Sequence, residues 1–113
     1  MKLIKKEETS KYKNSDNCIA TEYPMNDKDI NIAIIDITGR YPTKGRVVNN
    51  KCKEIVYVIK GKGKVFVDNK EISLEKGDMI LIEPKEKYYW DGYFTLFVPC
   101  TPAWYPEQHE EVD

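Results

Sequence analysis

Short runs of apolar residues, separated by turn residues, fill the middle of the chain between residues 54 and 84. β-Branched and aromatic residues dominate these runs, which is typical of strands. Glycines and an Asp-Asn pair lie between the runs and predict tight turns. The predicted strands cover residues 55–59, 64–67, 71–74 and 79–82, with turns at 61–63, 68–69 and 76–78. Strands so closely spaced leave no room for a helix, so this stretch predicts an antiparallel all-β sheet.

Similar runs lie on both sides of this stretch. They predict further strands at residues 18–23, 31–38, 46–49, 88–90 and 94–98, with a turn at 91–92. The first two strands are expected to form a hairpin. Residues 1–17 and 108–113 are polar and predict loose ends, while residues 100–106 hold two prolines and predict an extended tail. Many short strands with turns at intervals of about ten residues are typical of a β-sandwich or barrel.

Composition fits one globular domain. A chain of 113 residues predicts a single domain over residues 1–113, with a core at about 18–100, a polar N-terminal arm and an aromatic C-terminal tail. The 18 basic and 19 acidic residues give a net charge of −1, so the basic excess of a nucleic-acid binder is missing. No apolar run is long enough for a membrane span or a secretory signal. Three widely spaced cysteines argue against a disulfide framework and predict a cytoplasmic protein.

Two motifs in the central stretch carry a resemblance to a known family. Glu54, six further residues and Gly61 match the second half of the first cupin motif, and residues 77–84 look like the start of the second. The chain therefore resembles the small single-domain cupins, most clearly over residues 40–98. The resemblance implies an antiparallel jelly-roll β-barrel, the cupin double-stranded β-helix, with one ligand cavity.

The resemblance also implies a test for a metal, because metal-binding cupins place two histidines before the motif glutamate and one in the second motif. This chain has no histidine at those positions. Counting back from Glu54, they fall on Val48 and Asn50, or on Val47 and Asn49 with the longer spacing. Tyr88 takes the position in the second motif, and the only histidine, His109, lies far away in the tail. We therefore expect no metal and no other cofactor.

Strand alternation places Glu54 on the same face as Val56 and Val58. If that face is inward, as the resemblance implies, the carboxylate needs a cation, several hydrogen-bond donors or a raised pKa, since an unpaired buried charge is costly. Arg40 and Arg46 are the only arginines and are candidate partners. The alternative is that Glu54 lies near the rim and caps backbone amides.

Aromatic residues are the other candidates for the cavity wall. Tyr88 and Trp90 alternate with Tyr89, so they share a face and bring a phenol and an indole N–H into the barrel if that face is inward. Trp90 as a plain core residue is the alternative. Tyr41, in the loop before Pro42, is expected at the cavity mouth or exposed on a turn. The predicted ligand-binding residues are Arg46, Glu54, Tyr88, Trp90 and Tyr41.

Three further expectations concern the rest of the chain. Cys100 follows the last strong strand and is expected to be a buried, inert thiol. The aromatic tail is expected to fold back over the barrel mouth or over a partner subunit, with Trp104 as its anchor. Three strands, at residues 55–59, 79–82 and 94–98, are apolar on both faces, which predicts a homodimer that covers the outer face.

Two functions remain open. The first is a metal-independent cavity that binds a small polar metabolite, with sugar-related compounds among the candidates. The second is an enzyme resembling the metal-free sugar isomerases and epimerases of the family, with Glu54 and Tyr88 as an acid/base pair. The general base in those relatives is a histidine, which the predicted cavity lacks. A metal-dependent oxygenase is a weaker third candidate because the metal ligands are missing.

Overall fold

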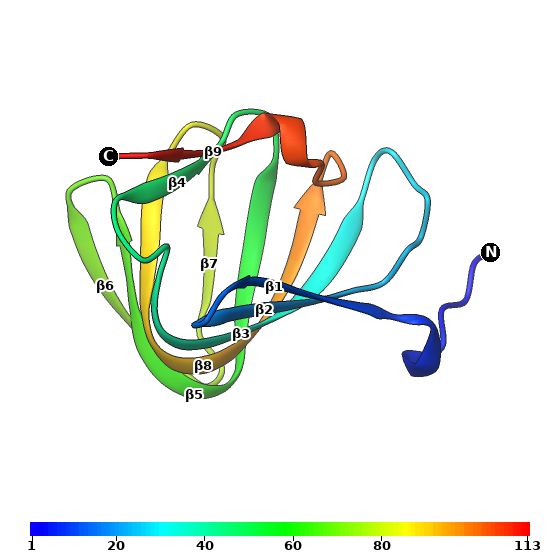
Figure 1. Ribbon diagram of the computed structural model, residues 1–113, viewed down its shortest axis with the longest axis horizontal. Coiled ribbons are helices and arrows are strands. Elements are labelled where there is room, and N and C mark those ends of the chain that lie inside the picture. Colours follow the sequence, from blue (N-terminus) through cyan, green and yellow to red (C-terminus); the bar gives the residue numbers. More distant parts are fainter.

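The computed structural model describes residues 1–113, which form one curled antiparallel sheet and two short 3-10 helices (Figure 1). The predicted all-β antiparallel barrel is thereby confirmed. Neither helix is long or apolar enough to cross a membrane. The elements are η1 (Lys6–Glu8), β1 (Ser10–Ser15), β2 (Cys18–Glu22), β3 (Asn31–Tyr41), β4 (Arg46–Asn49), β5 (Lys53–Val67), β6 (Lys70–Glu75), β7 (Met79–Ile82), β8 (Lys87–Thr101), η2 (Pro106–Gln108) and β9 (His109–Val112).

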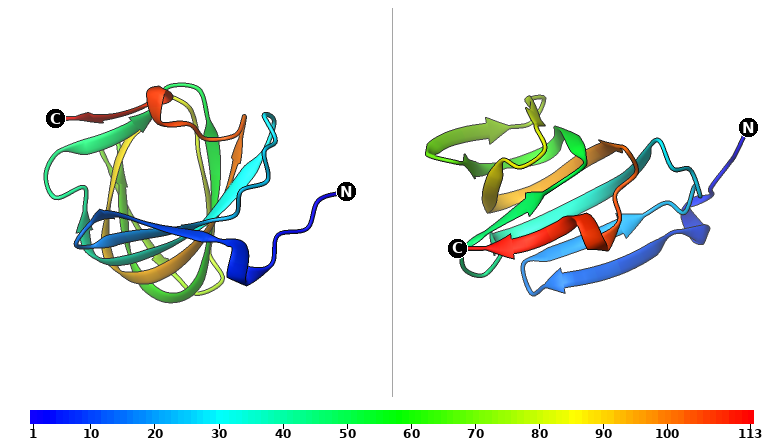
Figure 2. Two further views of the ribbon diagram at one scale, coloured as in Figure 1. Left: turned by 45° about the vertical axis from the view of Figure 1, so that its right-hand side comes forward. Right: turned by 90° about the horizontal axis from the view of Figure 1, so that it is seen from above.

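Two long strands, β5 and β8, hold the barrel together. They pair with each other along almost their whole length, from Lys53 opposite Thr101 to Val67 opposite Tyr88. Strand β8 also pairs with β3 and β4, and β5 pairs with β6 and β7. Both strands curve strongly, so each contributes to both sides of the barrel (Figure 2). The sequence predicted two short strands and a turn in place of each, and that prediction was wrong.

The predicted turns are instead sharp bends, and glycines explain why. Gly63 and Gly39 both lie opposite Gly92, so three neighbouring strands place a glycine in one row across the sheet. A Cβ on Gly92 would collide with the Cα of Gly63, and one on Gly61 would collide with the carbonyl oxygen of Tyr93. The strands approach one another this closely only because glycine has no side chain. The turns predicted at residues 68–69 and 76–78 do end strands.

Side chains alternate strictly along the first half of β5, as the sequence predicted. Glu54, Val56 and Val58 are buried while the residues between them are exposed. The inward residues join one core cluster with contributions from nearly all strands. Its members are Cys18, Ile37, Val47, Val56, Val58, Val65, Val67, Leu74, Ile82, Tyr88, Trp90, Phe94, Leu96, Val98 and Cys100.

Both ends of the chain are more ordered than the sequence predicted. Residues 10–15 form β1, which pairs with β2, and residues 109–112 form β9, which pairs with β4. Strand β1 has no apolar alternation, because it is an edge strand exposed along most of its length. The predicted β2–β3 hairpin is present. The tail between β8 and β9 passes over one end of the barrel (Figure 1).

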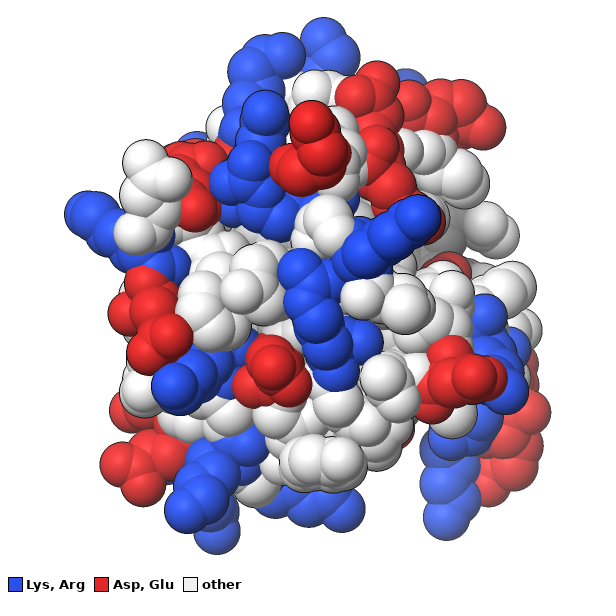
Figure 3. Space-filling model, turned by 60° about the vertical axis from the view of Figure 1, so that its left-hand side comes forward, with Lys and Arg blue, Asp and Glu red and all other residues white.

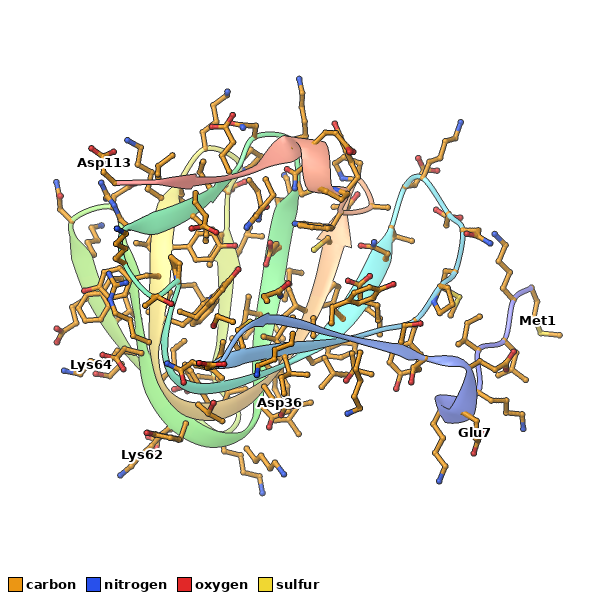
Figure 4. All side chains as sticks on the ribbon, viewed as in Figure 1. Met1, Glu7, Asp36, Lys62, Lys64 and Asp113 are labelled. Carbon is orange, nitrogen blue, oxygen red and sulfur yellow. The ribbon has the colours of Figure 1, made fainter.

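Charges of both signs are mixed on the surface. On the face in Figure 3, lysine, arginine, aspartate and glutamate alternate without a large area of either sign. Lys62 and Lys64 of β5 point away from the barrel (Figure 4). The mixture on this face agrees with the balanced composition of the chain, and the face has no basic area of the kind that nucleic acids require.

The assignment of Leu96 to the core can be tested by substitution. Leu96 is 1% exposed, so Leu96→Ala should lower the free energy of unfolding by about 2–5 kcal/mol through lost burial and a residual cavity. Leu3→Ala is the matched control, because Leu3 is 70% exposed and its loss should change stability by no more than about 0.5 kcal/mol. Chemical denaturation at constant m-value measures both. Equal effects of the two substitutions would contradict the assignment of the core.

Candidate functional site

The barrel encloses a cavity of about 400 Å³ that is lined by residues of β1, β2, β3, β8 and the loop before β3. Glu54 of β5 and residues of the C-terminal tail are also part of its lining. Lining side chains that can form hydrogen bonds or transfer protons include Tyr41, Glu54, Tyr88, Cys100, Trp104 and His109. No lysine or arginine is among the lining residues, so the cavity has no cationic side chain.

Glu54 lines this cavity from β5 and is 8% exposed. Its Oε1 accepts hydrogen bonds from Asn49 Nδ2 and from Tyr88 Oη, the latter at 3.3 Å. Burial raises the pKa of the Glu54 carboxyl, and these two hydrogen bonds oppose that rise only in part. The other carboxylate oxygen, Oε2, accepts no hydrogen bond from the protein. Every buried polar side-chain atom has a hydrogen-bond partner, so Oε2 is not buried. Oε2 is therefore open to the cavity.

Asn49 joins the barrel to the tail through its side-chain amide. Its backbone lies in β4 directly opposite His109 in β9. Its Oδ1 lies 3.2 Å from Trp104 Nε1, 3.0 Å from Gln108 Nε2 and 2.7 Å from His109 Nδ1. Its Nδ2 donates to Glu54 and, at 3.2 Å, to Tyr88 Oη. One buried amide therefore connects the carboxylate in the barrel with three residues of the tail.

Tyr88 and Trp90 both face inward from β8, as the alternation predicted. Tyr88 is 4% exposed, and burial, followed by the charge of Glu54, raises the pKa of its phenol. Trp90 packs edge-on against Tyr88, with ring centroids 5.9 Å apart, and belongs to the core as well as to the cavity wall. Tyr89 faces outward and stacks on Phe66.

Tyr41 is the last residue of β3 and not part of a loop. It is half-buried and lines the cavity, so the expectation that it reaches the ligand site agrees with its position. Burial is the main cause that raises the pKa of its phenol to about 12, and nearby Cys18, Glu111 and Glu54 add to it. Tyr41 therefore remains a neutral hydrogen-bonding phenol at physiological pH.

Neither candidate arginine partner of Glu54 pairs with it. Arg46 donates to the carbonyl oxygens of Asp113 and Asp68 and does not line the cavity. Arg40 packs over the Tyr89 ring at 3.9 Å and donates to the carbonyl oxygen of Gly45. Both guanidinium groups lie outside because β3 and β4 place those positions on the outer face. Hydrogen-bond donors take the place of a cation beside Glu54.

Cys100 lines the cavity, as expected for a residue that follows the inward alternation of β8. Burial raises the pKa of its thiol, and the neighbouring charge of Glu54 raises it further. A thiol of this kind stays protonated and is a poor nucleophile.

Sequence reasoning missed His109 and Gln108 as parts of the site, and it considered Asn49 only as a missing metal ligand. The tail was predicted to be loose beyond residue 107, yet Gln108 is 3% exposed. His109 is part of the cavity wall, so the prediction that the cavity lacks a histidine was wrong. The signal that pointed to this region was the density of aromatic residues in a terminal segment, together with Trp104 as its expected anchor.

The site does not fit a bound transition metal. Asn49, Glu54 and Tyr88 converge at the positions that histidines and glutamate take in metal-binding relatives, but an amide and a neutral phenol are poor ligands for such a metal. No group of three histidine, cysteine, aspartate or glutamate side chains lies close enough together to hold a metal ion. The amide and the phenol instead hydrogen-bond to the glutamate.

Comparison with known proteins identifies the fold. Residues 44–92 match the Cupin domain family. No curated protein matches the sequence. The nucleoside dehydratase Pac13 superposes with a TM-score of 0.89 at 16% identity, covering 99% of this chain and 91% of that one. Structures of three variants of Streptomyces Pac13 contain uridine.

Two more distant structures share the same barrel. The polyketide cyclase RemF from Streptomyces resistomycificus has a TM-score of 0.76 at 10% identity, covering 100% of this chain and 86% of that one. An RmlC-like cupin from Shewanella frigidimarina has a TM-score of 0.73 at 18% identity, covering 91% of this chain and 92% of that one. At these identities the similarity establishes the fold alone.

The raised pKa of Glu54 gives a prediction about stability. A carboxyl whose folded pKa lies above its ordinary value of 4.5 stabilises the protein fully below that value, and the contribution is lost as pH rises through the folded pKa. Glu54→Gln removes this ionisation and keeps an acceptor for Asn49 and Tyr88. The melting temperature of Glu54→Gln should therefore increase relative to that of wild type as the pH rises from 4.5 towards 8. Glu75→Gln, at an exposed position on β6, is the control and should show no such trend; parallel curves for Glu54→Gln and wild type would refute the prediction.

Proposed function

We propose that this chain binds a small, uncharged, sugar-containing metabolite of the nucleoside class without a metal. Its residues 44–92 match the Cupin domain family, and it has no histidine at the positions that bind a metal in other members. The observation that carries this proposal is the free Oε2 of Glu54 in a cavity walled by aromatic side chains. A carboxylate oxygen in that place accepts hydrogen bonds from hydroxyl groups, and aromatic rings pack against the faces of sugars and bases.

The charge of the cavity favours a ligand without phosphate. Its lining contains Glu22, Asp27 and Glu54 and no lysine or arginine. A phosphate beside Glu54 would meet a buried carboxylate with no cation to pair with, which is costly because burial weakens the screening of charge. An uncharged nucleoside or sugar avoids that cost.

Structural similarity supports the same class of ligand. Pac13, whose fold matches over nearly the whole chain, is described as a nucleoside dehydratase and has been crystallised with uridine. The barrel of that protein accommodates a nucleoside, and a barrel of the same shape is a reasonable host for one here. Uridine is therefore the first ligand to test.

An acid/base enzyme is the second candidate, and a specific observation favours it. Burial raises the pKa of the Glu54 carboxyl, which brings a carboxyl group closer to neutral pH and suits it to proton transfer. Tyr88 donates to the same carboxylate and would orient it towards a substrate hydroxyl. Proton transfer on a sugar ring is the reaction type that this pair fits.

Ligand binding tests the proposal directly. Uridine should bind in isothermal titration calorimetry, and uridine 5′-phosphate should bind at least about tenfold more weakly because of carboxylate repulsion. Treatment with a chelator should leave uridine binding unchanged. Glu54→Gln should weaken binding by about 1.5–3 kcal/mol, the range for a hydrogen bond to a charged group.

Two neighbouring tyrosines supply a matched pair of variants. Tyr88→Phe should weaken uridine binding, whereas Tyr89→Phe, which removes the same hydroxyl on the outer face, should have no effect. Binding of the phosphate in preference to the nucleoside, or loss of binding with the chelator, would refute the proposal.

We also propose that the protein is a homodimer that covers the outer apolar face of the barrel, defined here as Ile55, Tyr57, Met79, Leu81 and Phe97. These residues are adjacent across β7, β5 and β8, since Ile55 lies opposite Leu81 and Tyr57 opposite Met79 and Phe97. Met79 is 62% exposed and Leu81 46% exposed. A continuous apolar surface of this kind is typical of an interface.

Sedimentation velocity measures this assembly. Wild type should sediment as a dimer at micromolar concentration, and Leu81→Lys should shift it to monomer because a charge is then buried against apolar side chains. Leu3→Lys changes the same residue type in the N-terminal arm and should leave the dimer intact. A monomeric wild type would rule out the dimer without affecting the proposal for the ligand.

A further inference from the structure

The side chain of His109 is held in one orientation and, we infer, in one tautomer. We propose that Asn49 fixes His109 as the Nδ1–H tautomer, so that its Nε2 lone pair is the hydrogen-bond and proton acceptor of the cavity. This inference rests on the proposed function in one respect: the acceptor is useful only to a ligand that carries hydroxyl groups.

The orientation of the Gln108 amide is determined by the backbone. Its Oε1 accepts from the N–H groups of Lys51 at 3.1 Å and Cys52 at 3.2 Å. Because only an oxygen accepts two backbone N–H groups, the other end of the amide must be the NH₂ group. That group lies 3.0 Å from the side chain of Asn49 and donates to it.

The Asn49 amide is oriented in turn by its donors. Gln108 Nε2 and Trp104 Nε1 both approach the same atom of Asn49, and an indole nitrogen is only ever a donor. That atom must therefore be the oxygen Oδ1. The NH₂ group then points to Glu54 and Tyr88, where a carboxylate oxygen and a phenol oxygen accept from it.

His109 is the last member of the network. Its Nδ1 lies 2.7 Å from Asn49 Oδ1, and an oxygen acceptor at that distance requires a proton on Nδ1. Burial lowers the pKa of the imidazole, although the charge of Glu111 opposes this, so the ring is neutral near pH 7. A neutral imidazole carries a single proton, and with that proton on Nδ1 the Nε2 atom is an acceptor.

The position of the ring makes this acceptor available to a ligand. His109 lines the cavity and packs beside Trp104, with ring centroids 5.4 Å apart. Nε2 has no hydrogen-bond partner in the protein and is not sealed from solvent. A ligand hydroxyl in the cavity could donate to it.

One amide thus positions two proton-transfer groups. Asn49 Oδ1 fixes the imidazole as an acceptor, and Asn49 Nδ2 holds Oε1 of Glu54 and leaves Oε2 free. If a ligand hydroxyl is deprotonated here, its O–H bond breaks, the proton passes to Nε2 and the electron pair remains on the ligand oxygen. The carboxylate of Glu54 then offsets the charge of the imidazolium. This supplies the histidine base that the barrel strands lack.

Nitrogen-15 NMR tests the tautomer without any ligand. The chain has one histidine, so the imidazole signals are unambiguous. At neutral pH we expect Nδ1 to have the chemical shift of a protonated nitrogen and Nε2 that of an unprotonated one. Asn49→Ala should abolish this preference, whereas Asn50→Ala, one residue along, should retain it. Wild type in the Nε2–H form would overturn the inference, and this measurement decides it even if Asn49→Ala does not fold.

Titration with uridine separates this inference from the proposed function. Binding should move the Nε2 signal and leave the Nδ1 proton in place, and His109→Phe should weaken binding by about tenfold, as expected for one lost hydrogen bond. Binding of uridine without a change at Nε2 would refute the role of His109 and leave the proposed function intact. Absence of binding, with the Nδ1–H tautomer observed, would refute the uridine proposal and leave the tautomer assignment intact.

Discussion

The close approach of three strands at one row of glycines is the constraint on which the barrel depends. Gly39, Gly92 and Gly63 lie side by side on β3, β8 and β5, and a side chain on Gly92 or Gly63 would collide with the backbone of the paired strand. Bending at this row lets β5 and β8 continue from one side of the barrel to the other. Because both strands are long and paired throughout, their inward residues surround a single interior, and Glu54 and Tyr88 come to face each other across it.

The second organising interaction is the Asn49 side chain, which links that interior to the C-terminal tail. It accepts from the tail on one side and donates to the barrel site on the other. A buried amide with every polar atom satisfied is stable, and it gives a unique arrangement of the groups around it. The tail is therefore a structural part of the site, and strand β9 fixes its position by pairing with β4.

Hydrogen bonds among side chains take the place of metal ligation in this site. The positions that would hold a metal carry an amide, a carboxylate and a phenol, and these satisfy one another through hydrogen bonds. No arginine pairs with the carboxylate, and burial raises its pKa against the opposing effect of these hydrogen bonds. The lack of lysine and arginine in the cavity lining is the basis of the proposal for an uncharged, hydroxyl-rich ligand.

Local patterns in the sequence determined the strand content, the inward alternation of Glu54, Tyr88 and Trp90, and the loss of the metal-binding histidines, because each depends on residues close together in the chain. Only the tertiary structure decided that glycines at predicted turns are bends within long strands, that Arg46 lies outside, and that His109 lines the cavity. His109 and Asn49 are 60 residues apart, and no periodic pattern records such a contact. It arises from closure of the barrel, which brings the tail to strand β4.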